Sequence, residues 1–284
     1  MWLHNNPSLF RQTVLVLFLC PLTLVCQADI APADYRQQLS DKVWEENLKP
    51  ANFPDKQIIE GTAQDILEIK APYTAEDATV VPISIHTNIA QQPDAYVKKL
   101  HVYVDKNPVP LVGVFEFTPA SGRADLAMRI RVDDFSYVRA IAEMNNGELY
   151  MAKSFVRAKG ACSAPPPAGM EDSRKLLGTM KMNTIGDVVL GKPNLMQLMI
   201  RHPNITGMAP LKVGSRIIPP AHFVNTLEVG FNDQLVMKAQ LTFSISMDPA
   251  FRFYFVPDKA GTITVKGTDT EKNHFSATHD ITTS

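Results

Sequence analysis

The chain has 284 residues, of which 45% are hydrophobic, and its 28 basic and 29 acidic side chains give a formal net charge of −1. This balance gives no indication of nucleic-acid binding, which requires a strongly basic face. The apolar content excludes disorder over most of the chain, and 21 prolines are typical of strands separated by turns.

Residues 1 to 28 have the pattern of a secretory signal peptide. Arg11 is their one charged side chain, and the apolar run from Val14 to Val25 is too short to span a bilayer. Cys26-Gln27-Ala28 places small residues at both ends of a three-residue cleavage pattern. We therefore expect cleavage before Asp29 and a periplasmic mature chain without a membrane span.

The chain has three cysteines, and cleavage would remove two of them, Cys20 and Cys26. The alternative is a lipid anchor on Cys26, but Val25 stands where such signals have a small residue. After cleavage Cys162 is the single thiol of the mature protein, in a compartment where thiols tend to be oxidised.

The first element after the signal peptide is a predicted helix in the segment 29–56. Tyr35, Leu39 and Val43 stand at helical spacing, and Pro50 and Pro54 are expected to end the helix. The sequence leaves open whether this helix packs on the rest of the chain or reaches a partner.

Alternating apolar and polar residues then predict strands. Seven short runs, from DILEIKAPY to ELYMAKSFVRA, predict an antiparallel immunoglobulin-like sandwich over residues 57–159, and Asn145-Asn146-Gly147 predicts a hairpin between the last two. Small residues and three prolines interrupt the pattern over 160–178, which predicts a flexible linker. Alternation resumes over 179–284. The predicted fold is all-β, with two immunoglobulin-like antiparallel β-sandwich domains and a short N-terminal helix.

Cys162 lies in this linker, in the stretch VRAKGACSAPPPAG. It stands about five residues beyond the predicted last strand, which gives a reach of about 17 Å. We expect Gly160 and Ala161 to make the arm narrow and mobile, and Arg157 and Lys159 to support the thiolate modestly. An unpaired exposed thiol is a liability under oxidising conditions, so we interpret Cys162 as the working atom. An incidental surface cysteine is the alternative, and burial is not expected among such small neighbours.

The sequence predicts neither a metal site nor a cofactor. No histidine pair has zinc-site spacing, and CxxC, HExxH and EF-hand motifs are absent. The chain also lacks GxSxG, a P-loop and a dinucleotide fingerprint. A cysteine hydrolase built on Cys162 is disfavoured because a nucleophile needs rigid positioning. We therefore do not expect an enzyme. The histidines are expected to be structural or solvated: His86, His101, His202, His222, His274 and His279.

Several motifs, in order, resemble a known family. VRAKGACS ends the first half, and LMIRHPNITGM, IPPAHFVNTLEV and MDPAFRFYF follow in the second. They resemble the SoxY and SoxZ sulfur-carrier proteins of periplasmic sulfur oxidation, here as a fusion similar to the quinoprotein dehydrogenase-associated SoxYZ-like carriers. Residues from about 60 to 162 resemble SoxY, and residues 179 to 284 resemble SoxZ.

The resemblance implies that Cys162 bears a covalent intermediate, as a thiosulfonate or persulfide, which partner enzymes of sulfur oxidation load and process. Two features depart from the family. Ser163 and Ala164 stand where two glycines are expected, and the arm is tethered at both ends instead of being a free C-terminus. Fusion makes the contact between the two halves intramolecular, at high effective concentration.

Two functional hypotheses from different classes follow. The first is a non-enzymatic periplasmic carrier that presents its cargo on Cys162. The second is an accessory binding module for a periplasmic quinoprotein (PQQ-type) dehydrogenase, without covalent cargo. A thiol-dependent enzyme is a third reading. The sequence does not disclose the cargo, the partners, the oligomeric state or whether the linker is cut after export.

Overall fold

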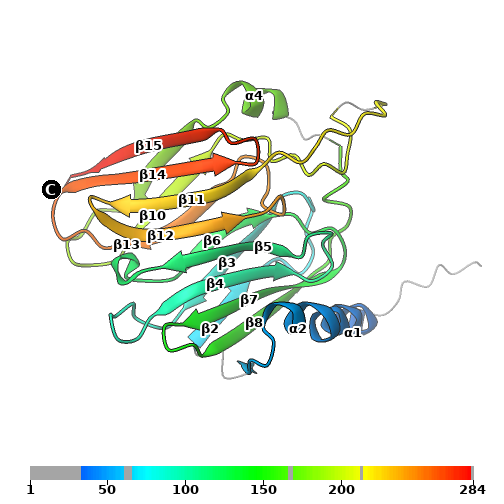
Figure 1. The fold of residues 1–284 in the computed structure, drawn as a ribbon, viewed down its shortest axis with the longest axis horizontal. Helices are drawn as coiled ribbons and strands as arrows, with labels where there is room; N and C mark the ends of the chain where they lie inside the picture. The colour runs from blue at the N-terminus through cyan, green and yellow to red at the C-terminus, as the bar shows by residue number, and fades with distance from the viewer. Residues whose placement is uncertain (1–32, 61–65, 166–168, 212–213, 283–284) are drawn as a thin grey trace, which may run out of the picture. The chain divides into compact units, whose positions relative to one another are not determined.

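Two β-sheets pack face to face in the computed structural model, which describes residues 33–60, 66–165, 169–211 and 214–282 (Figure 1). The nine-stranded sheet has the order β1 (Ile58–Ile59), β8 (Leu149–Val156), β7 (Ser136–Met144), β4 (Val97–Val104), β5 (Leu111–Phe117), β12 (Gln234–Leu241), β11 (Val224–Phe231), β14 (Gly261–Asp269) and β15 (His274–Ile281). The six-stranded sheet has the order β2 (Leu67–Lys70), β3 (Val81–Thr87), β6 (Leu126–Ile130), β13 (Ala250–Phe255), β10 (Asn194–Ile200) and β9 (Met180–Ile185). The predicted signal peptide, residues 1–28, lies outside the described residues.

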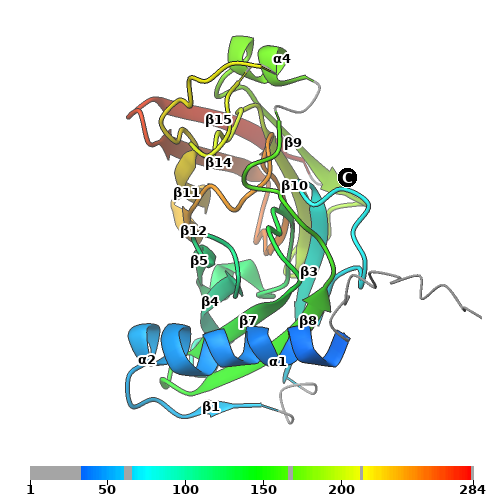
Figure 2. The same ribbon diagram turned by 90° about the vertical axis from the view of Figure 1, so that its right-hand side faces the viewer.

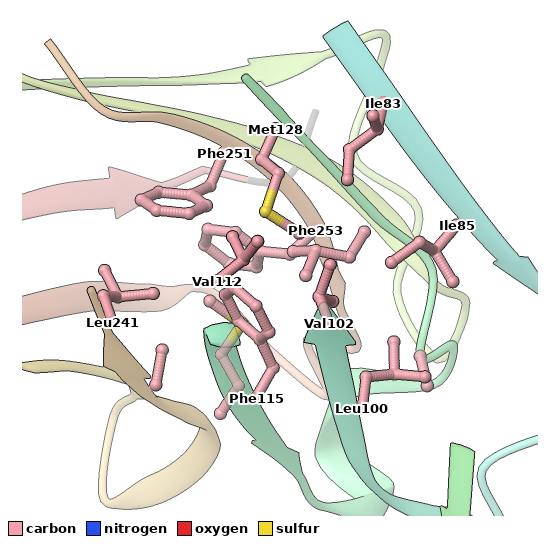
Figure 3. Close-up of a cluster of buried hydrophobic side chains, with 14 of the residues drawn as sticks. Ile83, Ile85, Leu100, Val102, Val112, Phe115, Met128, Leu241, Phe251 and Phe253 are labelled. Atoms are coloured by element: carbon pink, nitrogen blue, oxygen red, sulfur yellow. The ribbon is translucent and has the colours of Figure 1, made fainter. Parts of the chain in front are cut away.

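The alternating apolar and polar residues that predicted the strands correspond to alternating buried and more exposed side chains in the structure. In β3 and β10 every second side chain is buried, because successive side chains of a strand point to opposite faces of the sheet. Figure 3 shows the buried side chains meeting between the two sheets, with Phe115 of one sheet near Phe251 and Phe253 of the other. The all-β sandwich fold is confirmed, as is the hairpin at 145–147 that joins β7 to β8.

The N-terminal half of the chain (residues 33–165) and the C-terminal half (residues 169–282) are joined within both sheets. Strand β5 pairs antiparallel with β12, and β6 pairs antiparallel with β13. Gly113 on β5 permits the first junction, because a side chain there would meet the Gln240 carbonyl oxygen on β12 at 2.8 Å. The two predicted sandwiches therefore continue into each other, and the division of the chain at 160–178 stays a prediction.

The predicted N-terminal helix packs on the nine-stranded sheet beside β7 (Figure 2). It comprises α1 (Ala33–Val43), a π-helical turn η1 (Trp44–Leu48) and α2 (Lys49–Asn52). Trp44 is fully buried and lies with its ring 5.7 Å from that of Tyr103 on β4. Ser40 donates a hydrogen bond to Asp105 at 2.7 Å. These contacts answer the question that the sequence left open.

Pro50 does not end this helix, contrary to expectation. It lies at the first turn of α2, where a residue needs no intrahelical N–H bond, and the helix continues to Asn52. Two short helices complete the described elements, the 3-10 helix η2 (Pro119–Ser121) and α4 (Met170–Lys175). Across the described ranges, no helix is long and apolar enough to cross a membrane.

Candidate functional site

The chain that follows β8 does not leave the body of the protein. Arg157 donates its backbone N–H to the carbonyl of Tyr73 at 2.8 Å, and Gly160 donates its N–H to the carbonyl of Asp133 at 2.8 Å. Gly160 has a φ of 76°, in the left-handed region that favours glycine. This glycine therefore turns the chain back onto the protein, and Ala161 behind it is buried.

Cys162 is a free thiol that is only 1% exposed, so the prediction that the arm exposes this thiol is wrong, although Ser163 and Pro165 beside it are exposed. Its backbone N–H donates to Oδ1 of Asp133 at 2.7 Å, and its carbonyl oxygen accepts a hydrogen bond from Oγ1 of Thr206 at 2.7 Å. Asp133 belongs to the N-terminal half and Thr206 to the C-terminal half. Both halves therefore hold the cysteine, while the mobility of the arm in solution stays a prediction.

The apolar cover of Cys162 comes from residues distant in sequence. A cavity of about 30 Å³ adjoins the cysteine and is lined by Met170, Ile205, Pro210 and Leu211, among others. The small neighbours of Cys162 suggested exposure, but they also let the backbone fit closely between other segments. This is the physical reason for the wrong prediction.

The electrostatic surroundings of Cys162 disfavour a thiolate. Burial, and next the negative charge of Asp133, raise the pKa of Cys162 to about 12, although Arg131 acts in the opposite direction. At neutral pH the docked cysteine is therefore a neutral thiol, which is a weak nucleophile.

Arg131 lines the same cavity and is 5% exposed. Its guanidinium donates to three backbone carbonyls, those of Phe243 at 3.4 Å, Ile245 at 3.0 Å and Asn204 at 3.0 Å. No described carboxylate lies within ion-pair distance of it. Burial lowers the pKa of Arg131 to about 10, which still leaves it charged at neutral pH.

Asn107 fixes the segment that carries Arg131 and Asp133. Its amide donates to the carbonyl of Arg131 at 2.9 Å, and its side-chain oxygen accepts the N–H of Asp133 at 2.8 Å. None of these three residues was singled out from the sequence. The run RIRVDD does interrupt an alternating strand pattern with charges, but the contact with Cys162 depends on how the chain folds back.

Arg157 and Lys159, the predicted supports of the thiolate, lie against aromatic rings. The Arg157 guanidinium is 5.4 Å from the ring centre of Phe135, and Nζ of Lys159 is 5.5 Å from it. The charges that act on Cys162 are instead those of Asp133 and Arg131. The role predicted for Arg157 and Lys159 stays a prediction.

A second polar cluster, which the sequence did not predict, lies in the C-terminal half. His202, His222 and Asp269 are all buried, and one nitrogen or oxygen atom of each lies within 4.8 Å of the others. Oδ2 of Asp269 is 2.8 Å from Nε2 of His222 and 3.3 Å from Nε2 of His202. These residues are 20 or more positions apart, so no short motif reveals them.

Hydrogen bonding identifies this cluster as a network rather than a metal centre. Nδ1 of His202 accepts the backbone N–H of Asn204 at 3.1 Å, so in the neutral ring the proton is on Nε2 and points to Asp269. Burial lowers the pKa of His202 to about 4, so the ring is neutral at pH 7. A metal at Nε2 would need the opposite tautomer, which would set Nδ1–H against the N–H of Asn204.

Comparisons with known proteins bear on the site. Residues 51–162 match the family model of sulfur oxidation protein SoxY, and residues 183–280 match that of sulphur oxidation protein SoxZ. The SoxY match ends at Cys162. No curated protein matches the chain.

Solved structures with a similar fold include the sulfur carrier protein SoxY from Chlorobium limicola f thiosulfatophilum, with 24% identity over 44% of this chain and 99% of that one, at a TM-score of 0.33. They also include a variant of the superoxide reductase (neelaredoxin) from Ignicoccus hospitalis, with 13% identity over 35% of this chain and 93% of that one, at a TM-score of 0.32. The two family matches follow each other along one chain, and the docked cysteine is the last residue of the first match. The chain is therefore a fused SoxY/SoxZ-like protein, with a SoxY-family segment at residues 51–162 and a SoxZ-family segment at residues 183–280.

Proposed function

We propose that this protein is a periplasmic carrier in sulfur oxidation that holds its cargo covalently on Cys162 as a thiosulfonate or persulfide. The observation that carries this proposal is the position of Cys162, at the last residue of the SoxY match and between the two halves. The protein itself catalyses no reaction in this proposal, and partner enzymes of sulfur oxidation load and process the cargo.

Loading requires Cys162 to leave its pocket. The docked thiol is buried and neutral, whereas a thiol in water has a pKa of about 8.5 and ionises far more readily. Release breaks the hydrogen bond that the N–H of Cys162 donates to Asp133 and the one that its carbonyl oxygen accepts from Thr206, and water can replace both. The docked form is then the resting state of the carrier, protected from oxidation in an oxidising compartment.

Loading of Cys162 with thiosulfate is an oxidation, which defines what a partner enzyme has to do. Joining the Cys162 thiol to thiosulfate through a sulfur–sulfur bond releases one proton and two electrons. In this proposal a partner oxidoreductase takes the electrons. A persulfide differs from this product by the loss of the sulfonate group, which a partner hydrolase would release as sulfate with the oxygen of water.

Intact-mass analysis of the protein purified from its native host, without reducing agents, tests the proposal. We expect mass increments of one sulfur atom or of a thiosulfate-derived group on the wild-type protein, removed by a reducing agent. The matched control Cys162→Ser should show none. A wild-type protein that remains the bare thiol while sulfur is being oxidised would contradict the carrier role.

The burial of Cys162 favours a second candidate, an accessory module for a periplasmic quinoprotein dehydrogenase in which the thiol has no covalent role. This candidate predicts that Cys162→Ser retains binding to the dehydrogenase and the cellular phenotype. Loss of the phenotype in the serine variant, with folding intact, would instead support the carrier.

A further inference from the structure

The pocket of Cys162 holds the backbone rather than the sulfur. Asp133 accepts the N–H of Cys162, its carbonyl accepts the N–H of Gly160, and Thr206 donates to the carbonyl of Cys162. A change at the sulfur therefore leaves these three bonds chemically possible. Whether they persist depends on whether the changed side chain fits the space and charge around it.

The space beside Cys162 admits little more than the thiol. The adjoining cavity of about 30 Å³ has room for a group of roughly the size of one water molecule. The thiosulfonate formed from thiosulfate adds two sulfur atoms and three oxygen atoms, more than this cavity holds, so the group would extend out of the cavity or displace the segments that line it.

The negative charge of Asp133 beside Cys162 disfavours an anionic group on the sulfur. The Asp133 carboxylate lies 2.7 Å from the backbone nitrogen of Cys162, and its influence on the thiol exceeds that of Arg131. Arg131 would attract an anion, but three carbonyl oxygens already hold its guanidinium. A thiosulfonate or an ionised persulfide on Cys162 would thus bring a negative charge toward Asp133 in a site with little water to screen it.

We propose that this pocket is a latch that holds unloaded Cys162 and releases it when the sulfur carries an anionic group, with the carboxylate of Asp133 as the residue that discriminates. The inference rests on the proposed carrier function and adds its regulation. An empty carrier is kept closed, and a loaded carrier presents its cargo to the next partner enzyme. The cargo itself supplies the signal.

The test uses two adducts of nearly equal shape and different charge. The full chain with C20S and C26S, in which Cys162 is the one cysteine, is alkylated to completion with iodoacetate or with iodoacetamide. In each reaction the thiolate displaces iodide and its proton goes to the solvent. The products differ in carrying an anionic carboxymethyl or a neutral carbamidomethyl group on Sγ.

Hydrogen–deuterium exchange of the peptide that spans Gly160 to Ser163 reports release. We expect the amides of Gly160 and Cys162 to exchange at least about tenfold faster in the carboxymethyl form than in the carbamidomethyl form, the effect of one partly screened charge contact. Asp133→Asn should remove this difference because the amide keeps an acceptor oxygen without the charge. The matched control Asp134→Asn removes a charge one residue away, where Lys106 and Arg36 pair with it, and should preserve the difference.

Equal exchange of the two adducts in the wild-type background would overturn the latch, and so would a difference that survives Asp133→Asn. The first of these outcomes needs no variant and is decisive even where Asp133→Asn fails to fold. The experiment uses neither cargo nor partner. A bare thiol in the native host would therefore refute the carrier without changing this result, and equal exchange would refute the latch without removing the carrier.

Discussion

The pocket of Cys162 and the cluster around Asp269 are both buried polar sites, but they use their hydrogen-bonding groups to different extents. Asp269 accepts bonds from the rings of His202 and His222, from the side chain and the backbone N–H of Asn273, and from the backbone N–H of Glu271. At the other site, Arg131 makes three hydrogen bonds with a group that has five N–H donors, and it lacks a carboxylate partner within the described ranges.

This difference separates a structural site from a site that can change state. A fully satisfied buried network is costly to open, because each broken bond exposes a group that had a partner. The Cys162 pocket is attached by a few backbone bonds that water can replace, and its charges are unevenly matched. The first arrangement fixes the fold of the C-terminal half, and the second suits a segment that docks and undocks.

The largest predicted effect follows from removing the centre of the satisfied cluster. Asp269→Ala leaves two buried rings and two backbone N–H groups without their acceptor, and we expect the free energy of unfolding to fall by about 3–5 kcal/mol. Urea denaturation measures the loss. Asp280→Ala, at an exposed aspartate on β15, is the control and should change it by less than about 0.5 kcal/mol. A loss below about 1 kcal/mol for Asp269→Ala would contradict the structural role.

A smaller effect is predicted for acid. Burial lowers the pKa of His202 to about 4 from 6.5, so between these values the unfolded chain binds a proton that the folded protein does not. The stability that His202 provides is therefore complete above pH 6.5 and declines as the pH falls toward 4, by at most roughly 3 kcal/mol. Burial opposes ionisation of Asp269, but hydrogen bonds from Asn273, His222 and His202 outweigh it and lower the pKa of Asp269 to about 2, so this carboxylate stays charged throughout that window.

Urea denaturation of the wild type and of His202→Asn at pH 6.5, 5.5 and 4.5 measures how the stability of each depends on pH and so checks this prediction. The asparagine oxygen can replace Nδ1 as the acceptor for Asn204, but the side chain cannot take up the proton. We expect the variant to be less stable at pH 6.5 and to lose less stability on acidification than the wild type. Parallel slopes for the wild type and His202→Asn would show that His202 is not the group responsible.

The sequence predicted what depends on neighbours along the chain. Alternation assigned the strands and their buried faces, as in β3 and β10, and Asn145-Asn146-Gly147 marked a hairpin because these residues adopt the required backbone conformation. It could not predict which strand edges meet. The pairing of β5 with β12 joins residues more than 100 positions apart, and periodicity reports the face of a strand but not its neighbour.

The same limit applies to the two sites. Thr206 is 44 positions from Cys162, and Asp269 is 67 positions from His202, so neither contact has a local signature. At Cys162 the small flanking residues led to a wrong prediction of exposure. Such residues are compatible with an exposed arm, but equally with a segment that packs closely under other segments of the same chain. The position of the cysteine could be predicted, and its environment could not.

The smallest predicted effect concerns the pocket of Cys162. Thr206→Val keeps the shape of the side chain and removes the hydrogen bond that Thr206 donates to the carbonyl of Cys162 at 2.7 Å, together with the one that its hydroxyl accepts from the N–H of Met208 at 3.2 Å within the C-terminal half. Because a neutral hydrogen bond contributes about 0.5–1.5 kcal/mol, release should become about two- to tenfold more frequent, and alkylation of Cys162 at pH 8 should accelerate by the same factor. The rate of iodoacetamide labelling, followed by intact mass in the C20S and C26S background, measures this.

Thr226→Val, on the exposed face of β11, is the control and should leave the labelling rate unchanged. An unchanged rate in Thr206→Val as well would mean that the thiol reacts through global unfolding and not through local release. In that case Asp269→Ala, which lowers global stability, would accelerate labelling far more than Thr206→Val. The ratio of these two rates therefore distinguishes a cysteine that is docked and released from one that is simply part of the core.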